Sequence, residues 1–487
     1  MKNKSLLAGA AKSDISPELG IQIAGDIGRK RPCTGIKEPI YARALVLEQA
    51  GRRYCIVTVD VLAIDTPWSD EVRRRAQKQF GLDPKAIMVH ATQNHAAPSI
   101  GNHMCRDEWP LIPAEHDWLR GGDARYNEPA LAGMLDAIGQ AIGNLVPVTV
   151  AAGRAIDNRV AFNRRYIMRD GSHVCQPSVC DPEIVQVEGP ADPEVGVITL
   201  TGKNGRVVSA LLHHTSHPCH GFGGNEVHPG WPGAWCREME SDFGEACTAL
   251  VINGCCGNVI HFNYLNPDQQ QPFVDSHVEM GRLLSQSTRR ALQNMQPVPV
   301  TAFGWVHRIL PVPRRKIPAA LVAEATAKIK KTAGPAWTTI PGSTTAIRKT
   351  GVGKPADHTP KADPSVVRVE WDWVYAVGVL DIADERKTHP TFPYEMQAVR
   401  FGDAAILSLM GEPFVEAQLR IKGTTPFGFL QVAHMSNGYC GYIPSREALA
   451  GGGYETRTSH GSRLVPEALE MIEKAANGLL KKLHTAK

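Results

Sequence analysis

Short apolar runs that alternate with amphipathic helices are the feature that most constrains how this chain folds. Apolar runs bounded by turn residues predict strands over 42–47, 55–62, 86–91, 147–152, 195–200, 207–212, 249–252, 367–371, 375–380, 396–401 and 404–409. Apolar residues at helical spacing predict helices over 69–80, 128–145, 276–294, 319–331 and 466–484. The alternation predicts an α/β fold with mixed β-sheet layers flanked by helices, and a functional site at strand ends.

The boundaries of the first predicted helix follow from its sequence. Ser69 is expected to cap its N-terminus, and Asp70 and Glu71 suit the positive end of the helix dipole. Gly81 is expected to end it, because glycine adopts the left-handed conformation that closes many helices.

Length and composition predict one large domain. The chain has 487 residues, about three times the ~150 residues typical of a domain, yet no shift in composition separates independent units within 1–487. The stretch 311–366 differs from the rest, because a short basic helix is followed by Gly-, Pro-, Thr- and Lys-rich sequence without periodicity. We expect this stretch to be an insertion or lid.

Charge and hydropathy exclude several classes of protein. The 53 Lys and Arg nearly balance the 49 Asp and Glu, giving a net charge of +4, so a nucleic-acid partner is not expected. No window reaches the ~18 apolar residues of a membrane span, and the N-terminal apolar stretch is too short for a signal peptide. Eleven cysteines without a CxxC pair are typical of a reducing cytoplasm. The expected partner is a small-molecule or oligosaccharide substrate. The sequence leaves open whether the chain forms a homo-oligomer.

Histidines gather where predicted strands end. The sequence lacks GxxxxGK[ST], GxGxxG after a strand, GxSxG and HExxH, which removes the usual support for phosphoryl transfer and serine-triad chemistry. Two loops instead carry polar groups suited to a metal or to proton transfer: His90, Gln93, Asn94 and His95 in the first, and His213, His214, His217, His220 and His228 in the second. A single histidine beside a strand is more often structural, but two such loops favour a site.

Three other residues stand out near predicted strands. Glu412 follows a buried strand, and Tyr442 lies in a Gly-rich loop. Asp60 ends an apolar strand, where a buried carboxylate needs a partner, and a contact to a histidine is expected.

Seven motifs lie along the chain: AGAAKSDISPELG (8–20), IYARALVLEQAGRRYCIVTVDVL (40–62), ATQNHAAP (91–98), FNRR (162–165), SHPC (216–219), GEP (411–413) and NGYCGYI (437–443). Together they resemble the catalytic domain of the neutral, non-lysosomal ceramidase family. Each motif is weak alone, but together they extend from Ala8 to about Tyr454 in the order of that family.

The resemblance implies a zinc ion that activates water to cleave an N-acyl amide. It assigns the metal ligands His217, Glu412 and Tyr442, with Gln93 at the position of the remaining ligand. It assigns His95 as the catalytic histidine, Arg164 as the substrate-binding arginine and Tyr454 as the oxyanion-stabilising tyrosine. We also expect Tyr442 to act in catalysis, and Gln93, Asn94 and Asn258 to bind substrate.

The sequence departs from the family pattern at several positions of the expected site. The family has a histidine where this chain has Gln93, and a carboxamide oxygen is a poor zinc ligand, so His228 or His261 is considered as a replacement. The family's Gly-Asp-Val-Ser loop is Gly-Asn-Val-Ile here, with Asn258 second, so a serine important in ceramidases is absent. We expect the chain to be without the family's C-terminal immunoglobulin-like domain, and membrane ceramide is therefore not the expected substrate.

Three functions therefore compete. The first is a zinc-dependent hydrolase of an amide or ester bond in a soluble substrate. The second is a carbohydrate lyase, in which Gln93, Asn94 and Arg164 neutralise a uronate carboxylate while His95 and Tyr442 act as base and acid. The third, a binding protein on a decayed enzyme scaffold, has the least support.

Overall fold

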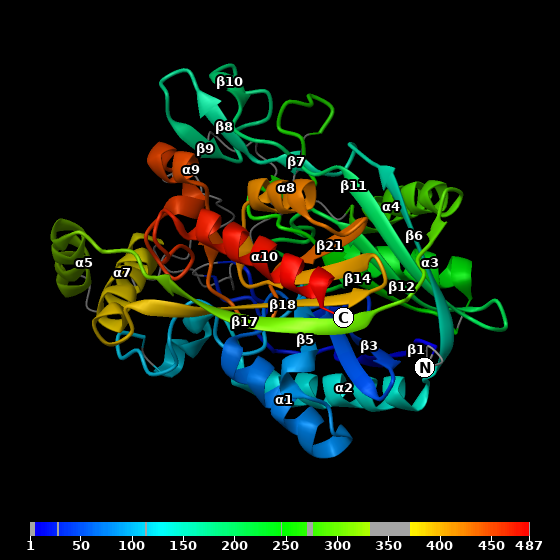
Figure 1. Cartoon of the computed structure of the whole chain (residues 1–487). Coiled ribbons are helices and arrows are strands. Elements are labelled where there is room, and N and C mark those ends of the chain that lie inside the picture. Colours follow the sequence, from blue (N-terminus) through cyan, green and yellow to red (C-terminus); the bar gives the residue numbers. More distant parts are fainter. Residues whose placement is uncertain are drawn as a thin grey trace.

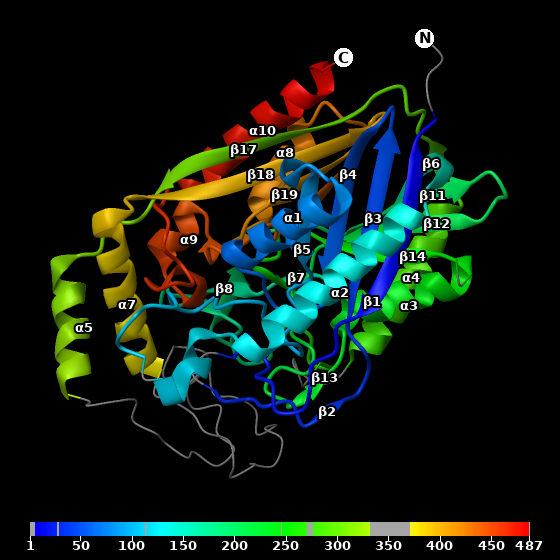
Figure 2. The ribbon, with the colours of Figure 1, turned by 90° about the horizontal axis from the view of Figure 1, so that it is seen from below.

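Two β-sheets lie face to face between layers of helices (Figures 1 and 2). The computed structural model describes residues 5–26, 29–112, 114–244, 246–269, 276–331 and 371–486. Within these ranges the larger sheet has nine strands, in the spatial order β14 (Thr248–Asn253), β12 (Val207–His214), β11 (Glu194–Gly202), β6 (Val146–Ile156), β1 (Leu7–Asp14), β3 (Tyr41–Gln49), β4 (Arg52–Val59) and β5 (Ile87–Ala91), with β16 (Gln296–Pro297) on β6. The smaller sheet has the order β17 (Phe303–Pro313), β18 (Thr391–Phe401), β19 (Ala404–Leu409) and β21 (Phe429–Ala433).

Both sheets are mixed. The pairs β4/β5, β12/β14 and β19/β21 are parallel, whereas the other neighbours in the two sheets run antiparallel. This confirms the predicted α/β class with mixed sheet layers. Smaller pairs decorate the ends of the sheets: β2 (Gly35–Ile36) with β13 (Glu226–Val227), β7 (Phe162–Asn163) with β15 (Val259–Ile260), β20 (Glu412–Pro413) with β22 (Tyr442–Ile443), and β8 (Arg165–Met168) with β9 (His173–Cys175) and β10 (Ile184–Val187).

Successive side chains along each strand point to opposite faces of the sheet, and both faces are covered by other layers. In β4, Ile56 faces the smaller sheet and packs with Val399 and Ile406, whereas Val57 faces the opposite way. That outer face is covered by α1 (Thr66–Phe80), α2 (Ala124–Gly143), α3 (Gly230–Phe243) and α4 (His277–Leu292). The outer face of the smaller sheet is covered by α8 (Val415–Thr424) and α10 (Ala468–Thr485). The strands are therefore buried on both sides, which explains their continuous apolar runs.

The first helix shows where the sequence signals hold. Gly81 ends α1 with φ 68°, as predicted. The capping residue is Asp65, whose side chain accepts a hydrogen bond from the Trp68 backbone N–H, and not Ser69. Pro67 lies in the first turn, where its missing N–H costs nothing, and this extends the helix towards its N-terminus by one turn.

One element has the wrong predicted type. The strand predicted over 375–380 is part of the helix α7 (Trp371–Thr388), and of the strand predicted over 367–371 only Trp371, in that same helix, is described. Its aromatic and β-branched residues favour a strand locally. However, Trp373 and Val377 lie one helical turn apart and pack in one cluster, while Ala376 and Val379 pack near α5 (Ala319–Lys331). Packing, rather than local propensity, therefore makes this segment a helix.

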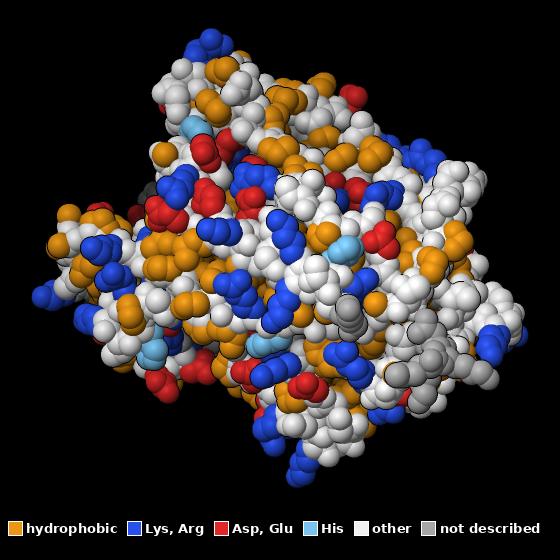
Figure 3. Space-filling model, viewed as in Figure 1, with side chains coloured by type: hydrophobic (Ala, Val, Ile, Leu, Met, Phe, Trp, Pro, Cys, Tyr) orange, Lys and Arg blue, Asp and Glu red, His pale blue; other side chains and the backbone are white. Residues whose placement is uncertain are grey.

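The stretch 311–366, expected to be an insertion or lid, is described only in part. Its residues 311–313 lie in β17, its residues 319–331 form α5, and 332–366 lie outside the described residues. No described helix is both long and apolar enough to cross a membrane. On the face in Figure 3, basic and acidic side chains are interspersed.

Backbone hydrogen bonds join several loops at one end of the sheets. The loops after β12 and β14 meet where the Gly254 N–H donates to His214. The loop after β21 reaches β14 and β5, since the N–H groups of His434 and Asn437 donate to Asn253 and Val89. The candidate site lies among these loops.

Candidate active site

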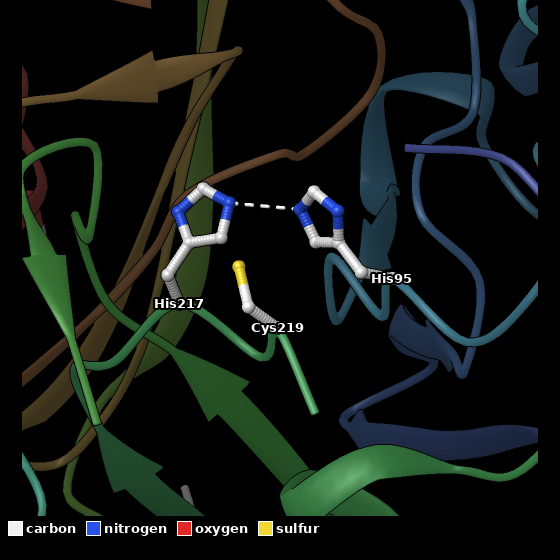
Figure 4. A group of neighbouring side chains, drawn as sticks. All are labelled: His95, His217 and Cys219. Carbon is white, nitrogen blue, oxygen red and sulfur yellow. Dashed lines mark hydrogen bonds between the residues drawn. The ribbon is translucent and has the colours of Figure 1, made fainter. Parts of the chain in front are cut away.

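Two histidines from separate strand ends face each other in this loop cluster. His95 lies in the loop after β5 and His217 in the loop after β12, and their Nε2 atoms are 2.9 Å apart (Figure 4). Both side chains are buried. Each Nδ1 atom contacts a backbone carbonyl oxygen, that of Gly25 at 3.1 Å for His95 and that of Cys256 at 3.3 Å for His217.

The Nδ1 contacts favour one tautomer of each ring. A carbonyl oxygen only accepts, so a neutral ring that donates from Nδ1 presents a lone pair at Nε2. Burial lowers the pKa of His95 to about 3 and the pKa of His217 well below its usual value, which keeps both rings neutral. At 2.9 Å the two Nε2 atoms can form an N–H···N hydrogen bond or bind one cation together. Metal-binding histidines commonly donate their second nitrogen to a carbonyl in this way.

Cys219 lies beside this histidine pair. Its thiol points towards the gap between the two rings (Figure 4), and the potential ligand atoms of the three residues all lie within 4.8 Å of one another. Burial raises the pKa of the thiol to about 12, although the Arg164 charge opposes that shift. Cys219 belongs to the SHPC motif, and the family resemblance assigns it no role.

Glu412 and Tyr442 stand opposite each other on the short parallel strands β20 and β22. One carboxylate oxygen of Glu412 accepts a hydrogen bond from the Tyr439 hydroxyl at 2.9 Å. The other, Oε2, is buried without a hydrogen-bond partner among the described residues, although Gln93 and Tyr442 are close enough to affect its electrostatics. Burial raises the pKa of Glu412 to about 7, and the Arg164 charge limits that rise. Such a carboxyl group is suited to proton transfer near neutral pH.

Arg164 brings a positive charge to Tyr442. Its guanidinium donates to the Tyr442 hydroxyl at 3.2 Å and to the Gly257 carbonyl at 2.7 Å. The same group is held by the buried Glu455 carboxylate at 3.0 Å. The Tyr454 ring packs edge-on against the Tyr442 ring, with centroids 5.8 Å apart. The three predicted residues Arg164, Tyr442 and Tyr454 therefore lie together.

Comparison with known proteins points to one enzyme. Over 217 residues the chain is 24% identical to the neutral ceramidase of Pseudomonas aeruginosa, a match that covers 43% of this chain and 30% of that relative's length. The crystal structure of the same ceramidase superposes with a TM-score of 0.69 at 18% identity, covering 99% of this chain and 75% of that one. A ceramidase complexed with C2 gives 0.69 at 17% identity, with the same coverage. No protein-family model matches the sequence.

This chain is similar to the neutral ceramidases in sequence and in fold. The finding confirms the resemblance that the sequence motifs predicted, and the likeness to the solved structures establishes the ceramidase fold. Nothing in the comparisons supports the lyase alternative.

Gln93, which stands where the ceramidase pattern has a histidine, contacts other side chains of the protein. It adopts a left-handed backbone conformation with φ 69°. Its side-chain oxygen accepts a contact from the Cys256 thiol at 3.3 Å. The amide therefore stands between Cys256 and Glu412, and not in the compact group of His95, His217 and Cys219.

The two predicted substrate-binding asparagines hold loops in place. The Asn94 amide donates to the His228 carbonyl at 2.6 Å, and its oxygen accepts from the Ala96 N–H. The Asn258 amide donates to Glu416 at 3.0 Å, and its oxygen accepts from the Val415 N–H at the start of α8. Both side chains use internal hydrogen bonds to position the backbone of site loops.

Neither histidine considered as a replacement ligand joins the His95–His217 pair. His228 stacks on His277 at 4.1 Å between centroids, and His261 stacks on His220 at 3.7 Å. Among the described residues, neither belongs to a compact group of potential metal ligands. His261 instead contacts the His217 carbonyl through Nδ1 at 3.3 Å, so it supports the backbone of that loop.

The expected contact between Asp60 and a histidine is wrong. The Asp60 carboxylate binds the Arg43 guanidinium at 2.5 Å and accepts from the Tyr41 N–H at 3.0 Å. Arg43 lies on the neighbouring strand β3, so the partner of this buried carboxylate comes from within the sheet.

A second compact group, Cys105, Asp381 and His460, lies near α7. Asp381 is hydrogen-bonded by both His460 and Arg106, and its pKa is lowered by these partners in spite of burial. With its carboxylate already neutralised, this group has the character of a structural ion pair.

Proposed function

We propose that this chain is a metal-dependent hydrolase that cleaves an amide or ester bond in a small substrate. The observation that carries the proposal is the pair of buried, neutral His95 and His217 rings, whose Nε2 atoms face each other at 2.9 Å. Two such imidazoles fit a divalent cation, and nitrogen and thiol donors together favour zinc. When bound there, the ion supplies a Lewis acid that lowers the pKa of water.

Glu412 is proposed as the proton acceptor. Its Oε2 atom is buried and without a hydrogen-bond partner among the described residues, and its pKa of about 7 allows it to take a proton from water near neutral pH. Tyr439 orients the carboxylate through the hydrogen bond to Oε1. As a hydrolase base, Glu412 would be active in its deprotonated form.

Arg164 and Tyr442 are proposed to stabilise the negative charge that develops on the substrate carbonyl oxygen. The guanidinium donates to the tyrosine hydroxyl, so the hydroxyl keeps its own hydrogen to donate either to the nearby Glu412 carboxylate or to a substrate oxyanion. Glu455 and Gly257 hold the guanidinium in place, which makes this donor pair preorganised. Tyr454 packs on Tyr442 and is proposed to complete the oxyanion side of the site.

The proposal is tested by hydrolysis of a panel that includes p-nitrophenyl esters, N-acyl amino acids and a short-chain ceramide. We expect turnover of at least one class by the wild-type chain and its loss in His217→Ala. His484→Ala, which alters an exposed histidine of α10, is the matched control and should retain full activity. Equal activity in wild type and His217→Ala would refute the assignment. Release of unsaturated uronates from acidic oligosaccharides, without hydrolysis of the panel, would replace it with the lyase.

A further inference from the structure

We propose that Cys219 is the third protein ligand of the metal centre, together with His95 and His217. This inference rests on the proposed function, and it changes the ligand set that the ceramidase resemblance implies. The thiol takes the place of the histidine that Gln93 replaces, and Glu412 is left free for proton transfer.

The local backbone builds the cysteine into the site. His217 and Cys219 are two residues apart, and the Cys219 N–H donates to the His217 carbonyl at 2.9 Å in a tight turn. The His95 N–H donates to the carbonyl of the intervening Pro218 at 3.2 Å. One turn therefore carries two of the three donors, and a backbone hydrogen bond ties the third to it.

The spacing of the donor atoms suits a small cation. The three ligand atoms lie within 4.8 Å of one another, and all three residues are buried. Tetrahedral zinc with Zn–N bonds of about 2.0–2.1 Å places its nitrogen ligands roughly 3.3 Å apart. The two Nε2 atoms, at 2.9 Å, therefore need to separate by only a few tenths of an ångström.

The other assigned ligands are less suitable. The Gln93 oxygen is occupied by the Cys256 thiol. The Tyr442 hydroxyl already accepts a hydrogen bond from Arg164. Among the described residues, Glu412 does not fall into the compact group with the two histidines. A centre with three protein ligands leaves a position for water, which is the pattern of catalytic zinc sites.

Cobalt substitution gives a readout of this ligand that does not depend on activity. The whole purified chain is stripped of metal with a chelator and titrated with Co²⁺. A thiolate ligand produces a sulfur-to-cobalt charge-transfer band in the near ultraviolet, beside the visible bands of a four-coordinate ion. We expect both sets of bands in the wild type at about one cobalt per chain.

Cysteine variants then show which thiol gives rise to the charge-transfer band. Cys219→Ser and Cys219→Ala should lose the charge-transfer band and weaken cobalt binding by at least about tenfold. Cys256→Ser is the matched control, because Cys256 lies beside Gln93 but outside the ligand group, and it should keep the band. If either Cys219 variant is unfolded, the wild-type spectrum alone still decides whether sulfur binds the metal.

The outcomes separate this inference from the proposed function. Cobalt bound without a charge-transfer band, or a band that persists in Cys219→Ala, would overturn the cysteine ligand. Metal-dependent hydrolysis in that case would leave the proposed function intact. A folded wild-type chain that binds neither zinc nor cobalt would overturn both.

Discussion

The Nε2 atoms of His95 and His217 lie 2.9 Å apart, although the two residues are 122 positions apart in the chain. They come from the ends of β5 and β12, two strands of the same sheet. The Nδ1 atom of each ring contacts a backbone carbonyl oxygen, so the fold orients both Nε2 atoms towards each other. Metal-binding histidines are commonly held in this way, through their second nitrogen.

Replacement of Glu412 by Gln tests the proton acceptor. The wild-type activity should rise as the pH increases through about 7, because burial raises the pKa of Glu412 to that value and only the deprotonated form accepts a proton. Glu412→Gln should lower kcat by about 10²–10⁴-fold and remove this rise. The measurement is a pH–rate profile from acid to alkaline pH. Glu473→Gln, which changes a carboxylate on α10, should leave the profile unaltered. A Glu412→Gln profile identical to that of the wild type would contradict the assignment.

Tyr442→Phe tests the stabilisation of the oxyanion. Loss of the hydroxyl that accepts from Arg164 should reduce kcat by about 10²–10³-fold with little change in KM, because the interaction forms in the transition state. Tyr54→Phe removes another buried hydroxyl, bonded to Gln397, and should affect stability but not kcat. Steady-state kinetics on the best substrate of the panel decides the matter. A loss confined to KM would mean that Tyr442 contributes only to substrate binding.

Gln93→His restores the histidine that the ceramidase resemblance expects. The left-handed conformation at this position tolerates histidine better than most bulky residues. We expect Gln93→His to recover part of the zinc affinity that Cys219→Ser loses, as measured by competition with a chromogenic chelator. If the double variant binds zinc no better than Cys219→Ser, the two positions do not substitute for each other.

The ion pair between Arg73 of α1 and Glu395 of β18 should contribute to stability. Hydrogen bonds from His307 and Arg73 outweigh the effect of burial and lower the pKa of Glu395 to about 2. The folded state thus favours the ionised form, so the contribution is complete above the ordinary pKa near 4.5 and is lost as the pH falls towards 2. Glu395→Gln leaves the Arg73 charge buried and should cost roughly 3–5 kcal/mol in urea unfolding at neutral pH.

The exposed pair of Arg74 and Glu71 on the same helix provides the control. Arg74→Ala should change the unfolding midpoint little, because solvent screens such a pair. If Glu395→Gln unfolds at the wild-type midpoint at every pH, the buried pair has no stabilising role.

The sequence predicts the elements that depend on local signals. Gly81 ends α1 because its left-handed φ is a property of glycine, and the apolar runs of β3, β4 and β5 are fixed by burial on both faces. The α7 helix is missed because Trp373 and Val377 have strand propensity, and only their packing reveals the helix. Likewise, the partner of Asp60 depends on the register of β3 against β4, which no motif reports.

The candidate site is predicted in part. Resemblance locates His95, His217, Glu412, Tyr442, Arg164 and Tyr454, and the structure places them in one loop cluster. It gives no role to Cys219, because a cysteine two residues after a histidine has no meaning until the turn between them is known. It also cannot distinguish the loop-supporting amides of Asn94 and Asn258 from amides that face a substrate, since that distinction lies in their hydrogen bonds. Glu455 and His434 are missed for the same reason.

The most direct test of a metal-dependent hydrolase is the activity of the purified chain before and after metal removal, with zinc content measured on the same samples. We predict about one zinc per active chain, loss of hydrolysis on chelation and its return when zinc is added back. His217→Ala should recover neither metal nor activity. Full hydrolysis by a chain shown to be free of metal would contradict the account.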